Sequence, residues 1–235
     1  MTIPTARKAP DTVPAERTAH DGGPPEATGW RPSFSGAELA FLVIVPLAWA
    51  VLLAFHGTPD SDDIYGSLRD EATAFIVVHL GSIAFIALMG EALYLLLRGV
   101  PGRAAQIGRL AIVPFVALYA AADAIAGLAT GILVKEANEG ADTAAGAQAL
   151  WDNFITGDLL FWLGGTAWIV AAIAAAVAVR QAGARTAVVV LLGLSAIVVF
   201  HAPPIGPLGL LFFAAAVVLL ARGGQARNGD MSAAM

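Results

Sequence analysis

Residues 71–98 read EATAFIVVHLGSIAFIALMGEALYLLLR, a long apolar run that carries one histidine, His79, and one acid, Glu91, between its ends. A bilayer core of about 30 Å requires about 20 apolar residues in helical conformation, and this run is longer. Backbone groups in lipid must hydrogen-bond within their own segment. The run is therefore predicted to be a membrane-spanning helix.

Five further apolar runs of this kind follow or precede it, so the sequence predicts an all-α, polytopic transmembrane helix bundle. The six expected spans are about 37–56, 71–98, 109–134, 155–179, 184–201 and 204–222. Only the segment 201–207, HAPPIGP, separates the last two. Proline cannot continue a helix and Gly206 permits a tight turn, which favours a hairpin of two short spans over one long helix.

The composition agrees with a membrane location and excludes several function classes. Of the 235 residues, 58% are hydrophobic and 13% charged, whereas about 25% of a soluble domain is charged. The chain contains no cysteine, which excludes disulfides, thiolate metal sites and thiol catalysis. The basic residues form no dense patch, so nucleic acid is not an expected partner.

Domain boundaries follow from the change in composition at each end of the apolar region. Residues 1–35 are rich in proline and poor in large apolar groups. Such a segment cannot bury enough apolar surface to offset the entropy of ordering it. We therefore expect a disordered cytoplasmic tail at 1–35, the six-helix transmembrane domain at 36–222 and a flexible cytoplasmic tail at 223–235.

The orientation follows from the basic residues. All but two of the 13 Lys and Arg residues fall in the two tails or in and beside the loops 99–108 and 180–185. The exceptions, Arg69 and Lys135, fall in the alternate connections, which are acidic. Basic loops remain on the cytoplasmic side, so both termini are expected in the cytoplasm.

Two ionisable residues are expected at similar depth within adjacent spans. At 1.5 Å per residue, His79 lies about 12 Å and Asp123 about 9 Å from the outer boundary. Charged groups within a span cost roughly 2.5–3.5 kcal/mol by insertion scales, so each requires a reason. A His–Asp pair in low dielectric holds a proton or binds a cation. The alternative, which we take as the default, is a hydrogen-bonded pair that joins two helices and binds no ligand.

Three more ionisable residues extend this candidate polar site in the outer half of the bundle: His56, Asp158 and His201. Three histidines and two aspartates suit a divalent metal such as zinc. No two of them, however, have i, i+4 spacing, and no helix contributes two. The sequence therefore predicts no metal and no cofactor.

Helix packing is indicated by Gly127 and Gly131, which form a GxxxG pattern that lets another helix approach closely. Tyr119, Asp123, Gly127 and Gly131 share one stripe at i+4 steps. Asp123 is therefore expected to face protein and not lipid.

A resemblance to known proteins rests on the alanine-rich spans and on two runs: 119–131, YAAADAIAGLATG, and 201–209, HAPPIGPLG. The chain resembles small six-span membrane proteins of high-GC Gram-positive bacteria. The resemblance implies a multi-pass protein of the bacterial cytoplasmic (inner) membrane and implies no activity.

Two functions of different class stay open on the sequence. The first is a small transporter-like protein with a polar site in the outer half of the bundle. The second is a membrane-embedded enzyme that uses His79 and Asp123 as acid and base. A non-catalytic accessory subunit is a third. The lipid bilayer is the one expected partner, a membrane-protein partner or a homo-oligomer is left open, and the ligand is unknown.

Overall fold

The computed structural model describes residues 33–136 and 141–233, and this part of the chain is helical without strands. The predicted all-α fold class is confirmed. Five helices are long and apolar enough to cross a membrane: Gly36–Leu53, Ala72–Leu97, Arg103–Glu136, Asp142–Gln181 and Ile205–Gly223. A sixth apolar helix, Thr186–Val199, is shorter. Residues 1–32 of the expected N-terminal tail lie outside the described residues.

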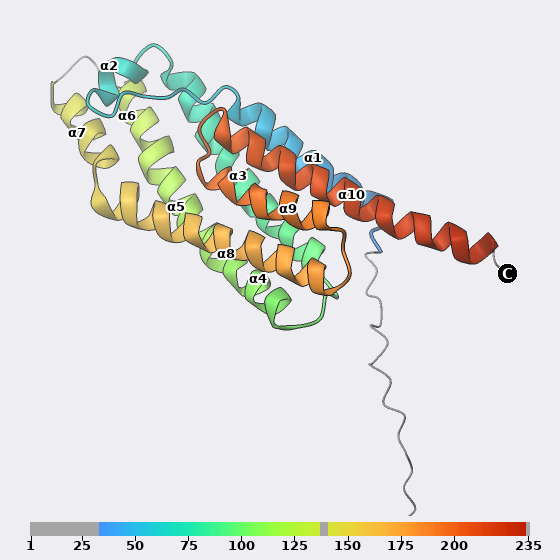
Figure 1. Cartoon of the computed structure of the whole chain (residues 1–235). Helices are drawn as coiled ribbons and strands as arrows, with labels where there is room; N and C mark the ends of the chain where they lie inside the picture. Colours follow the sequence, from blue (N-terminus) through green and yellow to red (C-terminus); the bar gives the residue numbers. More distant parts are fainter. Residues whose placement is uncertain (1–32, 137–140, 234–235) are drawn as a thin grey trace, which may run out of the picture.

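The helical elements follow one another with short connections (Figure 1). In chain order they are α1 (Gly36–Leu53), α2 (Ile64–Leu68), α3 (Ala72–Leu97), α4 (Arg103–Pro114), the π-helical η1 (Phe115–Tyr119), α5 (Ala120–Ala122), the π-helical η2 (Asp123–Ala129), α6 (Thr130–Glu136), α7 (Ala141–Trp151), the π-helical η3 (Phe154–Leu159), α8 (Leu160–Gln181), α9 (Thr186–Leu194), the 3-10 helix η4 (Ser195–Val199) and α10 (Ile205–Ala233).

Several bounds differ from those expected. The third long helix begins at Arg103, well before 109, directly after Gly102, which has a positive φ of 97°. The fourth begins as the separate helix α7, and its transmembrane part starts with η3. The last helix continues to Ala233, into the stretch expected as a tail.

The bundle has two ends (Figure 1), and their connections differ in the charged residues that they carry. The loops between α3 and α4 and between α8 and α9 lie at one end, which we call the basic end; Arg98 there binds Glu38 of α1 at 2.5 Å. The connections that carry α2 and α7 lie at the other, the acidic end. Gln148 of α7 joins these two elements, because its side chain accepts from the backbone N–H of Ile64 and donates to the carbonyl of Ser61.

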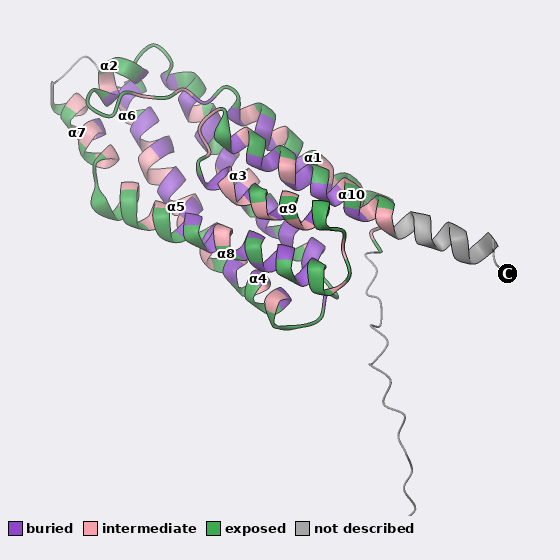
Figure 2. Cartoon of the chain, viewed as in Figure 1, coloured by how far each residue is buried: buried purple, intermediate pink, exposed green. Residues whose placement is uncertain are grey.

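Buried and exposed residues alternate along the helices of the bundle (Figure 2), and large apolar residues occur in both classes. The largest fully buried side chains include Trp49, Trp168, Phe115 and Phe213. Other large apolar residues point outward: Leu110 is 73% exposed and Val113 68%. In water such exposure would be costly, and in a bilayer these side chains face lipid tails.

Proline shapes the third long helix near the candidate site. Pro114 has no N–H to donate to the preceding turn, and its ring crowds the carbonyl four residues back. The π-helical η1 begins at the next residue, Phe115, and a second π-helical segment, η2, begins at Asp123. Single turns of π-helix occur often at functional sites. Both segments contribute residues to the cavity described next.

Candidate functional site

All five residues of the predicted polar site line one cavity of about 560 Å³ at the acidic end. They are His56, His79, Asp123, Asp158 and His201. They come from five different elements or turns, which the bundle brings together at one level. The volume is that of an ordinary small-molecule pocket.

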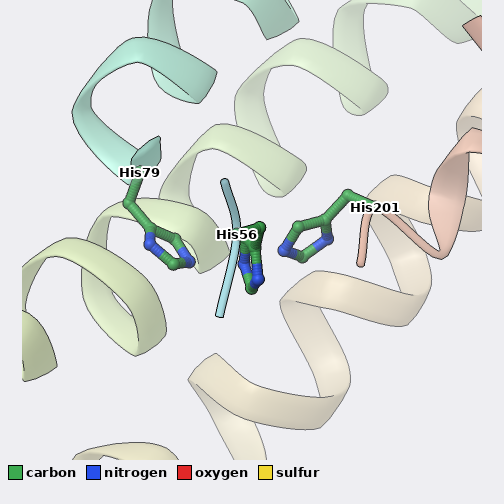
Figure 3. Close-up of side chains that lie close together, drawn as sticks. All are labelled: His56, His79 and His201. Carbon is green, nitrogen blue, oxygen red and sulfur yellow. The ribbon is translucent and has the colours of Figure 1, made fainter. Parts of the chain in front are cut away.

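Three of the five form a tight group, the histidine cluster of His56, His79 and His201 (Figure 3). His56 follows the end of α1, His79 lies in α3, and His201 lies in the turn before α10. One ring nitrogen from each lies within 4.8 Å of the other two. The ring of His56 lies between the others, with its centroid 4.8 Å from each of theirs.

The Nδ1 atoms of two of these rings are held by the backbone. His79 Nδ1 lies 2.8 Å from the carbonyl oxygen of Phe75, and His56 Nδ1 lies 2.5 Å from that of Gly57. A carbonyl oxygen accepts only, so each Nδ1 carries the proton and donates it. In a neutral imidazole the second nitrogen, Nε2, then keeps its lone pair.

The third ring is held through Tyr119. The phenolic hydroxyl donates to the carbonyl oxygen of Val199 at 2.6 Å. Its oxygen lies 2.9 Å from His201 Nδ1. Since its one proton is directed at Val199, the phenolic oxygen accepts from His201 Nδ1–H. The Nε2 lone pair of His201 is then free, as in the other two rings.

Burial keeps His56 and His201, the two histidines of the cluster that lie outside the long helices, uncharged at neutral pH. His56 is 9% exposed, and its buried Nε2 has no hydrogen-bond partner. Burial lowers the pKa of His56 below its usual 6.5 and lowers the pKa of His201 well below that value. Both rings are therefore neutral at pH 7, the form that coordinates metals.

Asp123 lies beside the cluster without bonding to it. Its Oδ1 is 3.9 Å from His79 Nε2, too far for a hydrogen bond, and its buried Oδ2 has no partner. The hydrogen-bonded His79–Asp123 pair taken as the default is therefore absent. A buried carboxylate without partners is costly, so the burial of Asp123 is not compensated by a hydrogen bond within the described residues.

The rest of the cavity wall is acidic and aromatic. Asp158 lies on the wall as an exposed side chain and is not part of the histidine cluster. Asp152 also lines the cavity, as do the aromatic side chains of Trp151 and Phe161. Among the described residues that line it, none is Lys or Arg.

The two glycines of the predicted packing stripe both lie against α3. A Cβ on Gly127 would overlap the ring of His79, and one on Gly131 would come within 3.0 Å of Phe75 and Ile76. The absence of a side chain at Gly127 therefore makes the space that the His79 ring occupies.

Sequence reasoning named the five polar residues but not how they group. It expected no metal, because the histidines lack helical spacing; the structure instead brings them together from three separate parts of the chain. It also missed Tyr119 as a site residue, although Tyr119 shares the stripe of Asp123. Comparison of the chain with protein-family models, with curated proteins and with solved structures finds no match.

Proposed function

We propose that the protein binds one divalent transition-metal ion, of the zinc type, between His56, His79 and His201. The observation that carries this proposal is that one ring nitrogen from each of three histidines converges within 4.8 Å, while the Nδ1 atoms are each held by an oxygen atom and leave the Nε2 lone pairs free. Histidines that bind metals almost always donate their other N–H to a carbonyl, carboxylate or water, which sets the tautomer. The unpartnered Nε2 of buried His56 is then a ligand atom.

The size of the group is compatible with such an ion after a small movement. Zinc–nitrogen bonds of about 2.0–2.1 Å in tetrahedral geometry place two ligand nitrogens about 3.4 Å apart. The nitrogens lie within 4.8 Å of one another, so the rings would approach by about 1 Å. His56 and His201 lie in turns, outside the long helices, and can move that far.

Imidazole ligands suit zinc, copper, iron and nickel ions. The described cluster has no sulfur ligand, and the chain has no cysteine. The nearby carboxylate of Asp123 favours a divalent ion over the softer monovalent copper. Zinc is the ion that we propose first.

The proposed location is the bacterial cytoplasmic membrane, with the basic end inside. The distribution of Lys and Arg supports this orientation through the positive-inside rule. The metal site then opens on the outer side, and the exposed apolar faces contact lipid.

Binding is better supported than passage through the bundle. Below the cavity, α4 packs on α8 through small residues, and Ala171 and Ala175 are fully buried. A Cβ on Gly108 of α4 would come within 2.7 Å of Leu97 of α3 and would meet Ala171 and Ala174 of α8 at 3.6 Å, so these three helices leave little space between them. A transporter-like role would require them to separate.

Metal analysis and thermal melts of the purified protein in detergent test the proposal. After incubation with zinc and removal of the free ion, we expect one zinc per chain, and a higher Tm than in EDTA. Zinc at 100 times its Kd stabilises by about 2.7 kcal/mol, which raises Tm by about 5–10 °C for a chain of this size. His79→Ala and His201→Ala should lose both effects, whereas His20→Ala, which removes the chain's remaining histidine, should keep them. Zinc retention by the double variant His79→Ala/His201→Ala would refute the proposal.

A further inference from the structure

We infer that this metal site is hydrolytic, with a water molecule on its fourth coordination position that Asp123 deprotonates for attack on a carboxylic ester or amide. The inference rests on the proposed function and adds a reaction and a substrate class to it. It depends on the number of protein ligands, on the placement of Asp123 and on the lining of the cavity.

The ligand count indicates an open site. Structural zinc sites are closed by four protein ligands, whereas catalytic zinc sites have three and keep the fourth position for water or substrate. The histidine cluster supplies three nitrogens, and no further His, Cys, Asp or Glu of the described residues joins the group. The fourth position would face the cavity, which all three histidines line.

Asp123 is placed to accept a proton from that water. Its Oδ1 lies 3.9 Å from His79 Nε2, which is one of the three proposed ligand atoms, and its buried Oδ2 has no hydrogen-bond partner. At this distance Asp123 does not hydrogen-bond to His79. Its carboxylate can therefore accept a proton from a water molecule bound to the ion beside it. A general base must be within hydrogen-bond reach of the proton that it removes.

The step balances with water as the only co-reactant. The water oxygen forms a bond to the acyl carbon as one of its protons moves to Asp123. The bond from the acyl carbon to the ester oxygen or amide nitrogen then breaks, and Asp123 returns the proton to the leaving atom. The products are a carboxylic acid and an alcohol or amine, and the bound ion supplies polarisation of the acyl oxygen.

The cavity lining selects the substrate class. Asp152 and Asp158 line it together with Asp123, and none of its described lining residues is Lys or Arg. A phosphate ester would bring further negative charge to a wall whose described residues include three carboxyl groups and no Lys or Arg, where the divalent ion would be the one positive partner; this is unfavourable. The rings of Trp151 and Phe161 offer apolar contact instead. An uncharged acyl compound with an apolar group therefore fits best.

Zinc-loaded protein in detergent, assayed with 4-nitrophenyl butyrate and 4-nitrophenyl phosphate, tests the inference. We expect zinc-dependent cleavage of the butyrate ester and none of the phosphate. Asp123→Asn should still bind one zinc and lose about 100-fold or more in rate, the usual contribution of a general base. Glu91→Gln is the matched control, because Glu91 is a carboxylate of α3 that does not line the cavity; it should keep the full rate.

A second measurement tests the open position without a substrate. With Co²⁺ in place of zinc, azide should change the visible absorption spectrum, because an anion can enter the fourth position. Zinc binding without ester cleavage, an unchanged rate in Asp123→Asn, or a cobalt spectrum insensitive to azide would overturn the hydrolytic inference and leave the metal site standing. Absence of zinc binding would instead overturn the proposed function itself.

Discussion

The ring of His79 lies against the bare backbone of Gly127, so that a single added methyl group would occupy the position of the ring. The missing side chain at Gly127 of η2 thus makes space for the His79 ring of α3, and that space has no room for a methyl group as well.

Gly127→Ala should displace His79 and disturb the contact between α3 and η2. Overpacking of this kind costs about 1–3 kcal/mol, and we expect a lower Tm together with loss of zinc binding. Differential scanning fluorimetry and metal analysis measure the two effects. Gly193→Ala is the matched control, because a Cβ there meets no atom within 4 Å, and its Tm should be unchanged or slightly higher. Normal zinc binding by Gly127→Ala would contradict the close packing described.

Tyr119→Phe should weaken zinc binding without abolishing it. The hydroxyl is the partner of His201 Nδ1, and loss of such a partner typically costs 10–100-fold in metal affinity. Competition with a chelator of known affinity gives the change in Kd. Tyr94→Phe, at a tyrosine 46% exposed on α3, is the control and should bind zinc as the wild type does. An equal Kd for the wild type and Tyr119→Phe would show that the hydroxyl does not orient His201.

The metal-free protein should lose stability as the pH falls below about 6.5. Burial lowers the pKa of His56 and of His201, and the neighbouring His56 and His79 lower that of His201 further. The unfolded chain, with ordinary histidines, then binds more protons than the folded one, so the free energy of unfolding decreases from pH 6.5 downward. The polar groups that face His201 are His56, His79 and Tyr119.

Thermal melts in EDTA between pH 8 and pH 5 measure this effect. A loss of 1 kcal/mol corresponds to a fall in Tm of about 2–4 °C for a chain of this size. His201→Gln should flatten the decline, and His20→Ala should not. A Tm that is constant from pH 8 to pH 5 in the wild type would contradict the prediction.

The orientation can be tested by labelling single cysteines in cells, since the native chain has none. Cysteines at Ser61 and Asp142, at the acidic end, should react with an impermeant thiol reagent added from outside. Cysteines at Pro101 and Gln181, at the basic end, should react only after the membrane is opened. Gly102 and Gly183 are unsuitable positions, because their φ angles of 97° and 91° strain any other residue. Labelling of Gln181→Cys from outside would reverse the orientation.

The fold was largely predictable from the sequence, because the length of an apolar run is a local property. The run 71–98 alone predicts the helix α3, which is observed at Ala72–Leu97. The weakest prediction was the span 184–201: its helix is the shortest of the six and ends as the 3-10 segment Ser195–Val199. The helix start at Arg103 was also missed, since hydropathy does not mark where a helix begins outside the apolar run.

The sequence predicted which residues form the candidate site and that they lie at a similar depth in the bundle. It did not predict that three of them meet. His56, His79 and His201 are far apart in the sequence, and no spacing rule within one helix connects them. Whether two such residues meet depends on the rotation of each helix about its axis, which close packing determines. The stripe from Tyr119 to Gly127 passes through π-helical turns, so ordinary helical spacing describes its faces only in part.

The position of His201 in the turn before α10 has a consequence for biogenesis. A nascent chain that has inserted α1 and α3 already holds two of the three histidines, but the third follows only after α9 and η4 have been synthesised. A chain halted before that turn therefore carries an incomplete set of ligands. Metal capture would report that the last hairpin had docked, and zinc would trap the finished bundle in preference to partly inserted forms.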